Sequence, residues 1–479
     1  MQIYNTLTRK KEDLIPLEAG RVKMYACGIT VYDFCHLGHA RALLTYDIIA
    51  RYLKYKGYQV LFVRNITDID DKIINRANER GIDYRDLTKQ YIGYFYEDTN
   101  TLGLLRPDHE PRATDCIAEI IALVQGLIDK DLAYNVHGDV FYAVRKFKGY
   151  GKLSGKNIEE LSSGARVDVN EAKRDPLDFA LWKAAKLNEP SWDSPWGKGR
   201  PGWHIECSAM SMKYLSATFD IHGGGRDLIF PHHENEIAQS EGFTDKPFAR
   251  YWFHNGFVNI NTEKMSKSLG NFKTIRDILQ KFPAEVVRFF ILSSHYRSPL
   301  DYTDQNIFDA VTSLERYYET KKRLKDYCAQ GLDPASPEKL GDKIAAFKND
   351  FITSMDDDFN TAKVVGAVFE WVRVWNKLLD EGRALCDDIR VFFNVIEEIH
   401  QTLGMFGSDP DVFLTELKNK RVTQTAVSPE SIEGLIAERQ GARKGKNFKR
   451  SDEIRDELLK NGIVLKDHPD GTTSWTVKG

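Results

Sequence analysis

The segment from residue 22 to residue 66 most narrows the folds open to this chain. Val22 to Ala26 is a short run of strand-forming residues, and a turn-rich stretch follows it. Ala40 to Lys56 carries apolar residues at helical spacing, and Gly57 ends that pattern. Tyr58 to Ile66 is rich in Val, Phe, Ile and Leu and predicts a second strand. A strand, a helix and a strand in this order predict a doubly wound, Rossmann-like parallel sheet.

The rest of the chain divides into regions of different character. We expect residues 1–255 to form the α/β domain, interrupted by an insertion at about 94–200 that contains a helix at 117–130 and a hairpin at 139–144. A region at 256–307 precedes a helical bundle at 308–407, in which an acidic stretch at 356–358 is expected to form the first turn of a helix. A polar linker at 408–430 leads to a small α+β tail at 431–479, with a basic helix at 439–460 and a hairpin turning at 470–471.

Composition excludes several classes of protein. With 479 residues, 42% apolar and 29% charged, the chain is long enough for several domains and a sizeable core. Lys and Arg total 67 against 70 Asp and Glu, which excludes a globally basic nucleic-acid coat protein. Six cysteines without a CxxC pair favour a reducing compartment over a disulfide framework. No membrane-length apolar run or leader pattern is visible, so we expect a cytoplasmic protein that makes no membrane contact.

Two short segments carry residues suited to phosphate binding. The tetrapeptide His-Leu-Gly-His at 36–39 lies between the first strand and its helix, where backbone N–H groups and the positive helix end attract phosphate. The imidazoles of His36 and His39 add donors, and Gly38 has no side chain to keep a flat base away. In Lys-Met-Ser-Lys-Ser at 264–268, two lysines in a loop can neutralise a phosphate chain. Taken alone, each segment is more often a solvated surface loop.

A third group of residues has the chemistry of a metal site. Cys27 ends the first strand, where doubly wound folds place their ligands, and Cys207 lies in a Gly-Trp-His-Ile-Glu-Cys segment. His232 and Glu236 are four residues apart, so a helix would place them on one face. Two thiolates, an imidazole and a carboxylate suit zinc, but the spacing is not that of a zinc finger, and buried cysteines are usually inert. The competing ligands that spacing leaves open are His222, His233 and Cys35.

In their order along the chain, the two phosphate-binding segments resemble the HIGH and KMSKS signatures of class I aminoacyl-tRNA synthetases. Longer segments resemble one family of that class, the cysteinyl-tRNA synthetases. These are CGITVYD at 27–33, RNITDIDDK at 64–72, GWHIEC at 202–207, HGGG at 222–225, FPHHENE at 230–236 and MDDDFNT at 355–361. The likeness runs through nearly the whole chain and is loosest at about 408–430. Leu37 stands where the family's first signature has Ile, an isosteric difference.

The resemblance implies a ligase that activates cysteine with ATP and transfers it to the 3′ end of tRNA(Cys). The cysteine carboxylate would attack the α-phosphate of ATP and release pyrophosphate, and a terminal ribose hydroxyl of the tRNA would then attack the adenylate. For such chemistry a protein supplies mainly positioning and charge neutralisation. A soft thiolate binding directly to Zn²⁺ would distinguish cysteine from serine, which an apolar pocket does poorly. A separate editing domain is then unnecessary, and the resemblance favours a monomer.

The resemblance also assigns roles to single residues. One Zn²⁺ per chain would be held by Cys27, Cys207, His232 and Glu236, and Mg²⁺ would arrive with ATP. The catalytic residues would be His36, His39, Lys264 and Lys267, and ATP would contact Gly38, Asp227 and Lys267. Asp227 would hold either a ribose hydroxyl or the substrate ammonium group. Thr67, Trp203 and His204 would shape the amino-acid pocket. Arg443, Asp452 and Asp467 occupy positions like those of the family's anticodon-reading residues, and Phe448 stands where the family often has Trp.

Three alternatives stay open at this point. A cysteine ligase that passes cysteine to a small amino-sugar would share the adenylation core, but we expect it to lack the tail. An inactive zinc-containing RNA-binding paralogue is disfavoured by the presence of both histidines and both lysines of the two signatures. The basic run at 439–460 ordinarily means a solvated helix face, whereas the functional interpretation is phosphate contact beside the anticodon.

Overall fold

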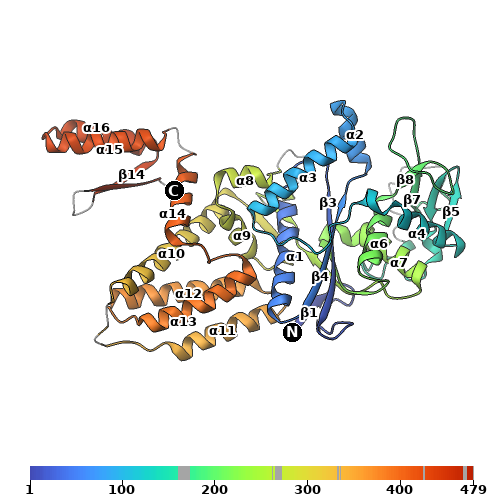
Figure 1. Cartoon of the computed structure of the whole chain (residues 1–479), viewed down its shortest axis with the longest axis horizontal. Helices are drawn as coiled ribbons and strands as arrows, with labels where there is room; N and C mark the ends of the chain where they lie inside the picture. The colour runs from blue at the N-terminus through green and yellow to red at the C-terminus, as the bar shows by residue number, and fades with distance from the viewer. Residues whose placement is uncertain are drawn as a thin grey trace.

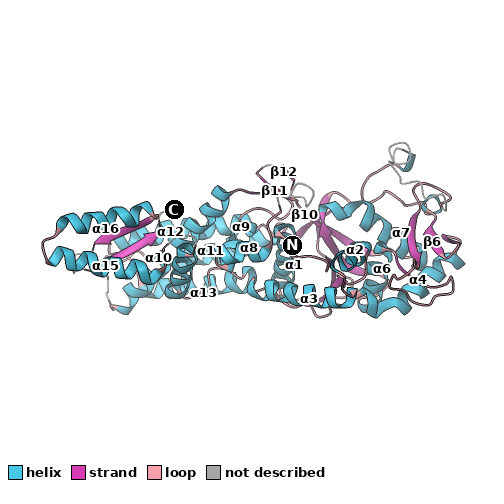
Figure 2. Cartoon of the chain, turned by 90° about the horizontal axis from the view of Figure 1, so that it is seen from above, coloured by secondary structure: helices cyan, strands magenta, loops and turns pink. Residues whose placement is uncertain are grey.

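The computed structural model describes residues 1–159, 173–261, 263–264, 272–331, 334, 336–423, 427–467 and 472–477. The molecule is elongated, with an α/β domain at one end, a helical bundle next to it and a small tail at the other end (Figures 1 and 2). Among the described residues, no helix is both long enough and apolar enough to cross a membrane.

A four-stranded parallel sheet forms the centre of the α/β domain. Its strands are β3 (Arg21–Thr30), β4 (Gln59–Thr67), β9 (Phe219–Gly225) and β10 (Ala249–Asn255), in the order β10-β9-β3-β4. The chain passes from β3 outward to β4 and later forms β9 and β10 on the other side of β3. The strand order therefore reverses between β3 and β9, which is where open α/β sheets bind their ligands.

Helices cover both faces of this sheet (Figure 1). α1 (Leu37–Tyr55) connects β3 to β4 on one face, and α6 (Trp203–Tyr214) and α7 (Glu234–Thr244) pack on the other. Met24 and Ala26 of β3 belong to the apolar cluster of α1, whereas Tyr25 between them belongs to the cluster that contains Met210 and Ile237. This alternation follows the two-residue period of a strand, so one short sequence faces two different helix layers.

The insertion carries a second, antiparallel sheet in the order β5-β6-β7-β8. Its strands are β5 (Ala133–Val136), β6 (Asp139–Tyr142), β7 (Phe179–Ala184) and β8 (Gly199–Pro201). Between β4 and this sheet the chain forms α2 (Asp71–Arg80), α3 (Tyr84–Thr101), η1 (Ala113–Cys116) and α4 (Ile117–Asp129), and η2 (Val144–Lys146) follows β6. Residues 139–144, expected to form a hairpin by themselves, supply only one strand, because β6 pairs with both β5 and β7.

Short elements surround the main sheet. β1 (Gln2–Asn5) and β2 (Lys10–Asp13) pair at the N-terminus, and the turns η3 (Arg226–Leu228) and η4 (Ile229–His233) join β9 to α7. β11 (Val258–Ile260), β12 (Glu263–Lys264) and β13 (Leu300–Tyr302) form a small sheet in the order β12-β11-β13. Between β12 and β13 the chain forms α8 (Ile275–Lys281) and α9 (Ala284–Leu292).

The bundle continues past residue 407, where the sequence pattern predicts that it ends. Its helices are α10 (Asp304–Ala329), α11 (Gly341–Asp356), α12 (Thr361–Asp380), α13 (Cys386–Leu403) and α14 (Pro410–Val422). α14 occupies much of the expected linker at 408–430, because Phe413 is buried and its ring stacks on Tyr318 of α10 at a centroid distance of 4.1 Å. The acidic stretch at 356–358 is not the first turn of α12: Asp356 ends α11, and Asn360 caps α12 by accepting from Lys363 N.

The tail is a helical hairpin with a two-stranded sheet. Its elements are α15 (Pro429–Lys444), α16 (Phe448–Lys460), β14 (Ile463–Asp467) and β15 (Thr473–Val477). The single basic helix expected at 439–460 is wrong, because Lys446 has a φ of 57° and breaks it into parts of α15 and α16. β14 and β15 pair antiparallel, and the predicted turn at 470–471 lies outside the described residues. The expected fold class, a doubly wound α/β domain with an insertion, a helical bundle and a small α+β tail, is confirmed.

Candidate functional site

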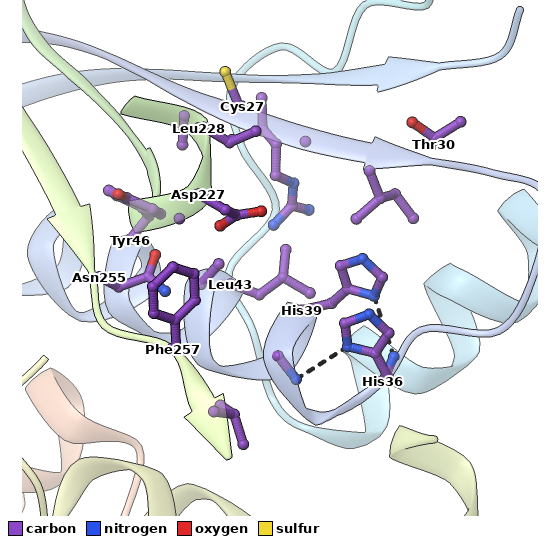
Figure 3. A pocket seen from close by; sticks show the side chains of 18 of the residues that line it. Cys27, Thr30, His36, His39, Leu43, Tyr46, Asp227, Leu228, Asn255 and Phe257 are labelled. Carbon is purple, nitrogen blue, oxygen red and sulfur yellow. Dashed lines mark hydrogen bonds between the residues drawn. The ribbon is translucent and has the colours of Figure 1, made fainter. Parts of the chain in front are cut away.

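A cavity of about 360 Å³ opens beside β3 and β9, where the strand order reverses (Figure 3). Six of the predicted site residues line it, namely Cys27, His36, Gly38, His39, Trp203 and Asp227. Cys27 lies at one end of the cavity, the two histidines lie at another, and Asp227 lies between them (Figure 3). The fold therefore places Cys27 of the predicted metal site and the first phosphate-binding segment around one cavity.

The two histidines of the first signature form the N-terminus of α1. The helix begins at Leu37, earlier than the sequence pattern predicts, and His36 is its N-cap. His36 Nδ1 accepts from Gly38 N at 3.1 Å, and His39 Nδ1 accepts from His36 N at 3.2 Å. The rings stack at a centroid distance of 3.8 Å. Because each Nδ1 accepts a hydrogen bond, the proton of a neutral ring is on Nε2, which makes Nε2 a donor at the positive end of a helix.

An irregularity in β3 aims Cys27 at the cavity. The pairing of β3 with β4 shifts between Ala26 and Ile29, which changes the direction of the residues between them. At Gly28 the strands lie so close that a Cβ would be 1.6 Å from Asn65 O, and Gly28 N donates to Asn65 Oδ1 at 2.8 Å. Glycine at 28 therefore permits the close approach of the two strands beside Cys27. Cys27 does not end the first strand, as the sequence predicts, because β3 pairs with β4 again at Ile29 and Thr30.

Cys27, Cys207, His232 and Glu236 converge from four elements: β3, α6, η4 and α7. Their potential ligand atoms all lie within 4.8 Å of one another. The two sulfurs are 3.9 Å apart, Cys27 Sγ is 3.6 Å from Glu236 Oε1, and His232 Nε2 is 3.0 Å from the same oxygen. The donor set, with two sulfurs, a nitrogen and an oxygen, fits the chemistry of a zinc site.

A second set of potential ligands shares two members with the first. Cys27, His222, His233 and Glu236 also place one ligand atom each within 4.8 Å of the others. His222 Nε2 is 2.7 Å from Glu236 Oε2, and His233 Nε2 is 3.3 Å from Cys27 Sγ. Of the three competing ligands left open by spacing, His222 and His233 thus remain, whereas Cys35 belongs to neither set. The cluster could hold a metal ion in either way.

Charges inside this buried cluster shift its proton affinities strongly. The hydrogen bond from Cys27, with help from His232, lowers the pKa of Cys207 to about 6 against the opposing effect of burial. Burial raises the pKa of Glu236, but the charges of His222 and His232 outweigh it and bring the value to about 2. Burial lowers the pKa of His232, but Glu236 and Cys207 outweigh it and raise the value to about 10. A thiolate and a carboxylate are therefore available near neutral pH, and a cation bound there would displace the imidazole proton.

The three predicted pocket residues have different positions. Trp203 lines the cavity, is 40% exposed, and has its ring centroid 4.3 Å from that of His232. Thr67 and His204 do not line it: Thr67 Oγ1 donates to buried Glu206 Oε2 at 3.1 Å, and His204 Nδ1 lies 2.8 Å from His232 Nδ1. The side chains of Thr67 and His204 therefore contact Glu206 and His232, not the cavity.

Several lining residues had no role in the sequence analysis. They include Tyr32, Arg64, Lys72, Asn255, Gly256 and Phe257. Lys72 lies in the RNITDIDDK segment, and its Nζ is 5.7 Å from the Tyr32 ring centroid. Asn255 ends β10 and residues 256–257 directly follow it, so the rule that ligands bind beyond the carboxyl ends of parallel strands could have found them.

The second signature is only partly described. The backbone of Lys264 ends β12, where it pairs with Asn259, and Lys267 lies outside the described residues. In the tail, Asp467 accepts from Arg439 at 2.8 and 3.0 Å and from Arg443 at 2.9 Å. The hydrogen bonds from Arg439 hold the pKa of Asp467 well below its usual value. Asp452 pairs with Arg455 of its own helix at 3.3 Å, so the three predicted tail residues do not form one cluster.

Comparison with known families identifies the class of protein. Residues 13–312 match the family model of the class I (C) tRNA synthetase catalytic domain, residues 350–407 match the DALR domain, and residues 426–475 match the cysteinyl-tRNA ligase anticodon binding domain. The structure resembles the methionyl-tRNA synthetase of Mycobacterium tuberculosis with a TM-score of 0.58 at 15% identity, covering 80% of this chain and 88% of that one. A putative arginyl-tRNA synthetase of Campylobacter jejuni gives 0.57 at 11% identity, covering 81% and 94%. Fold and matched domains are those of a class I aminoacyl-tRNA synthetase.

Curated relatives narrow the class to a family. A protein of Trichlorobacter lovleyi and one of Geobacter metallireducens, each named cysteine–tRNA ligase, are 54% identical to this chain, and each alignment covers 100% of both proteins. The chain belongs to the cysteine–tRNA ligase family.

Proposed function

We propose that the chain activates cysteine with ATP and transfers it to tRNA(Cys). The observation that carries this proposal, beyond the family itself, is the single cavity that has a soft, metal-capable cluster at one end and a helix N-terminus with two histidine donors at the other (Figure 3). Cysteine bound with its sulfur at the cluster has its carboxylate directed into the space toward α1. The triphosphate of ATP fits the positive end of α1.

The zinc ligands in this proposal are Cys27, Cys207, His232 and Glu236. Two sulfurs suit zinc better than the one sulfur of the competing set. His222, which binds the far oxygen of Glu236, and His233, whose Nδ1 is 2.7 Å from His254 Nε2, then orient the ligands from outside. When bound there, zinc supplies a soft Lewis acid that prefers a thiolate sulfur to a serine hydroxyl. A selectivity of about 10⁵ corresponds to roughly 7 kcal/mol.

Residues at the other end of the cavity position the phosphates. Nε2 of His36 and of His39 donate to phosphate oxygens, and Lys264 and Lys267 neutralise the charge that develops as pyrophosphate leaves. Gly38 lets the adenine or ribose approach α1, and Mg²⁺ accompanies ATP. Asp227 projects into the middle of the cavity, where it accepts from a ribose hydroxyl or from the ammonium group of cysteine.

The tail supports tRNA as the acceptor over a small amino-sugar. Residues 426–475 match an anticodon-binding domain, and a small acceptor has no use for such a domain. Arg443 lies at the surface with 47% of its side chain exposed, where it can contact nucleic-acid phosphate. Asp452 and Asp467 remain candidates for contacts to anticodon bases. Asp467 already accepts from two arginines, so its part includes holding Arg443 in place.

The test is ATP–pyrophosphate exchange with cysteine or serine, followed by charging of tRNA(Cys). We expect exchange that depends on cysteine, is at least a thousandfold weaker with serine, and leads to aminoacylated tRNA. Exchange that depends on cysteine without transfer to tRNA would favour the amino-sugar acceptor. Absence of exchange in protein that binds tRNA would favour the inactive RNA-binding paralogue.

A further inference from the structure

The junction between α11 and α12 has an unusual backbone. Asp358 and Phe359 both have positive φ, at 62° and 52°, although neither is glycine. Left-handed conformations are uncommon for such residues and persist only where the surrounding structure holds them. Both side chains are buried, Asp358 completely and Phe359 to 2% exposure. The contacts that keep this turn in place therefore indicate what it does.

The three aspartates of the turn reach three different elements of the α/β domain. Asp356 accepts from Tyr52 OH of α1 at 2.8 Å. Asp357 pairs with Lys11 of β2 at the surface. Asp358 accepts from the backbone N–H of Tyr4 in β1 at 2.8 Å, and its own N–H donates to Gln2 O at 2.9 Å. The turn thus joins the bundle to the α/β domain, beside the N-terminus of the chain (Figure 1).

Asp358 also binds the segment 295–298, which follows α9. Its Oδ1 accepts from Tyr296 OH at 2.9 Å, and its Oδ2 accepts from Arg297 Nε at 2.7 Å. His295 Nε2 lies 3.6 Å from the same Oδ2. One buried carboxylate therefore fixes three consecutive side chains of this segment.

The segment 295–298 in turn supports a wall of the catalytic cavity. Gly256 N donates to Tyr296 O at 2.8 Å, and Leu300 N donates to Phe257 O at 2.9 Å. A Cβ at Gly256 would lie 2.3 Å from Ser298 O, so the two backbones are in direct contact. Gly256 and Phe257 line the cavity, and the chain continues from them into β11 and β12, which ends at Lys264.

Arg41 of α1 holds the same segment from the other side. Its guanidinium donates to the carbonyls of Ile291, His295, Tyr296 and Ser298, at distances between 2.7 and 3.2 Å. Arg41 is 1% exposed and lies two residues after His39 on the helix that forms the phosphate end of the cavity. The segment is therefore clamped between the α1 guanidinium and the carboxylate of the bundle turn.

We propose that Asp358 is a positioning residue for cysteinyl-adenylate formation: it holds segment 295–298, and through that segment the cavity wall at 255–257 and the strands leading to Lys264, in register with the N-terminus of α1. This proposal rests on the proposed function. Asp358 contacts no substrate and acts through Tyr296 and Arg297. The metal-capable cluster, on β3, α6, η4 and α7, is not attached to this segment by the bonds described. Loosening the segment should therefore slow the chemical step more than it weakens cysteine binding.

The experiment compares full-length Asp358→Asn with the parent chain under single-turnover conditions, with excess enzyme. The first-order rate constant of adenylate formation reports positioning, whereas a misfolded fraction lowers only the amplitude. We expect a rate constant lower by about tenfold to a hundredfold, as for a small misplacement of reacting groups, with the cysteine concentration dependence changed by less than about threefold. Asp357→Asn, which removes the neighbouring surface pair, is the matched control and should retain the parental rate constant.

Tyr296→Phe removes one hydroxyl from the same carboxylate and perturbs folding less. It should lower the rate constant in the same direction, and in combination with Asp358→Asn it should add little, because both act through one contact. A parental rate constant in Asp358→Asn, or a loss of amplitude alone, would overturn the positioning role. If the rate effects of the two substitutions multiply in the double variant, Asp358 does not act through Tyr296. A parent chain that forms no cysteinyl-adenylate would instead refute the proposed function.

Discussion

The catalytic cavity and the tail differ in how they hold their charged groups. Cys207, His232 and Glu236 are at most 2% exposed, and each lies a few ångströms from an oppositely charged or hydrogen-bonding neighbour. Arg443 and Asp467 have 47% and 40% of their side chains exposed. Buried charges are fixed by their neighbours and are costly to disturb, whereas exposed ones are screened by salt. The charged groups beside the cavity are thus held in fixed positions, whereas those of the tail are open to solvent.

Among the substitutions that distinguish the buried cluster from the tail, we expect the largest effect from Cys207→Ser. The hydroxyl is far harder to ionise than the thiol, so we expect loss of tightly bound metal. Cysteine-dependent exchange should fall by about a thousandfold, or roughly 4 kcal/mol of transition-state stabilisation. Metal analysis and exchange assays measure both effects. The control is Cys35→Ser, a buried cysteine outside both ligand sets. Metal retained in Cys207→Ser but lost in His233→Asn would assign the ion to the competing set.

A smaller effect is expected at the phosphate end of the cavity. His39→Asn removes an imidazole donor at the N-terminus of α1, and we expect adenylate formation to slow by about a hundredfold. Metal content should stay at the parental level, because His39 belongs to neither set of potential ligands and lies away from Cys27 in the cavity (Figure 3). An unchanged rate would show that the helix end alone suffices for the triphosphate.

In the tail a single exposed charge should matter less and in a different assay. For Arg443→Ala we expect the KM for tRNA in charging to rise by about tenfold, and the dependence on salt to weaken by about one counterion. Pyrophosphate exchange should be unaffected, since the tail lies at the far end of the molecule (Figure 2). Arg390→Ala, a surface arginine of α13 paired with Asp387, is the control. Equal loss of exchange and charging would break the proposed separation of the two regions.

The smallest effect concerns the stability of the tail. Hydrogen bonds from Arg439 lower the pKa of Asp467, so its carboxylate stabilises the folded tail at pH values above the ordinary aspartate pKa of about 4. This contribution is lost as the pH falls through the lowered folded pKa. Because 40% of the Asp467 side chain is exposed, Asp467→Asn should cost no more than about 1 kcal/mol at pH 7. Hydrogen exchange of tail peptides should show a difference from the parent that shrinks below pH 4, and a constant difference would exclude the ion pair as its cause.

Local sequence patterns predicted the parts of the fold that depend on neighbours in the chain. The run from Val22 to Ile66 carries both strand periodicity and helix periodicity, and the structure has β3, α1 and β4 there. The pattern could not predict that Asp356 ends one helix while Asn360 begins the next, because Asp358 is held by Tyr296 and Tyr4, far away in sequence. The pattern likewise missed the break at Lys446. A lysine in a left-handed conformation has the same charge as its neighbours in the basic run, so the sequence does not mark it.

The sequence predicted the chemistry of the candidate site but not which residues belong to it. The types of residue indicated a soft metal site and a phosphate site, and the resemblance selected four ligands. Spacing could not exclude His222 and His233, which approach Glu236 and Cys27 only because β9 and η4 meet beside β3. Gly256 and Phe257 were missed because no motif marks them, although they follow the carboxyl end of β10, where parallel sheets bind their ligands.

In the proposed function, the buried cluster recognises cysteine by its sulfur. X-ray absorption at the zinc edge of the loaded protein, without amino acid, with cysteine and with serine, tests it directly. With Cys27 and Cys207 as ligands, we expect one additional sulfur neighbour of the zinc when cysteine is added and none when serine is added. An unchanged sulfur count with cysteine, in protein that still activates it, would show that the substrate sulfur does not bind the metal.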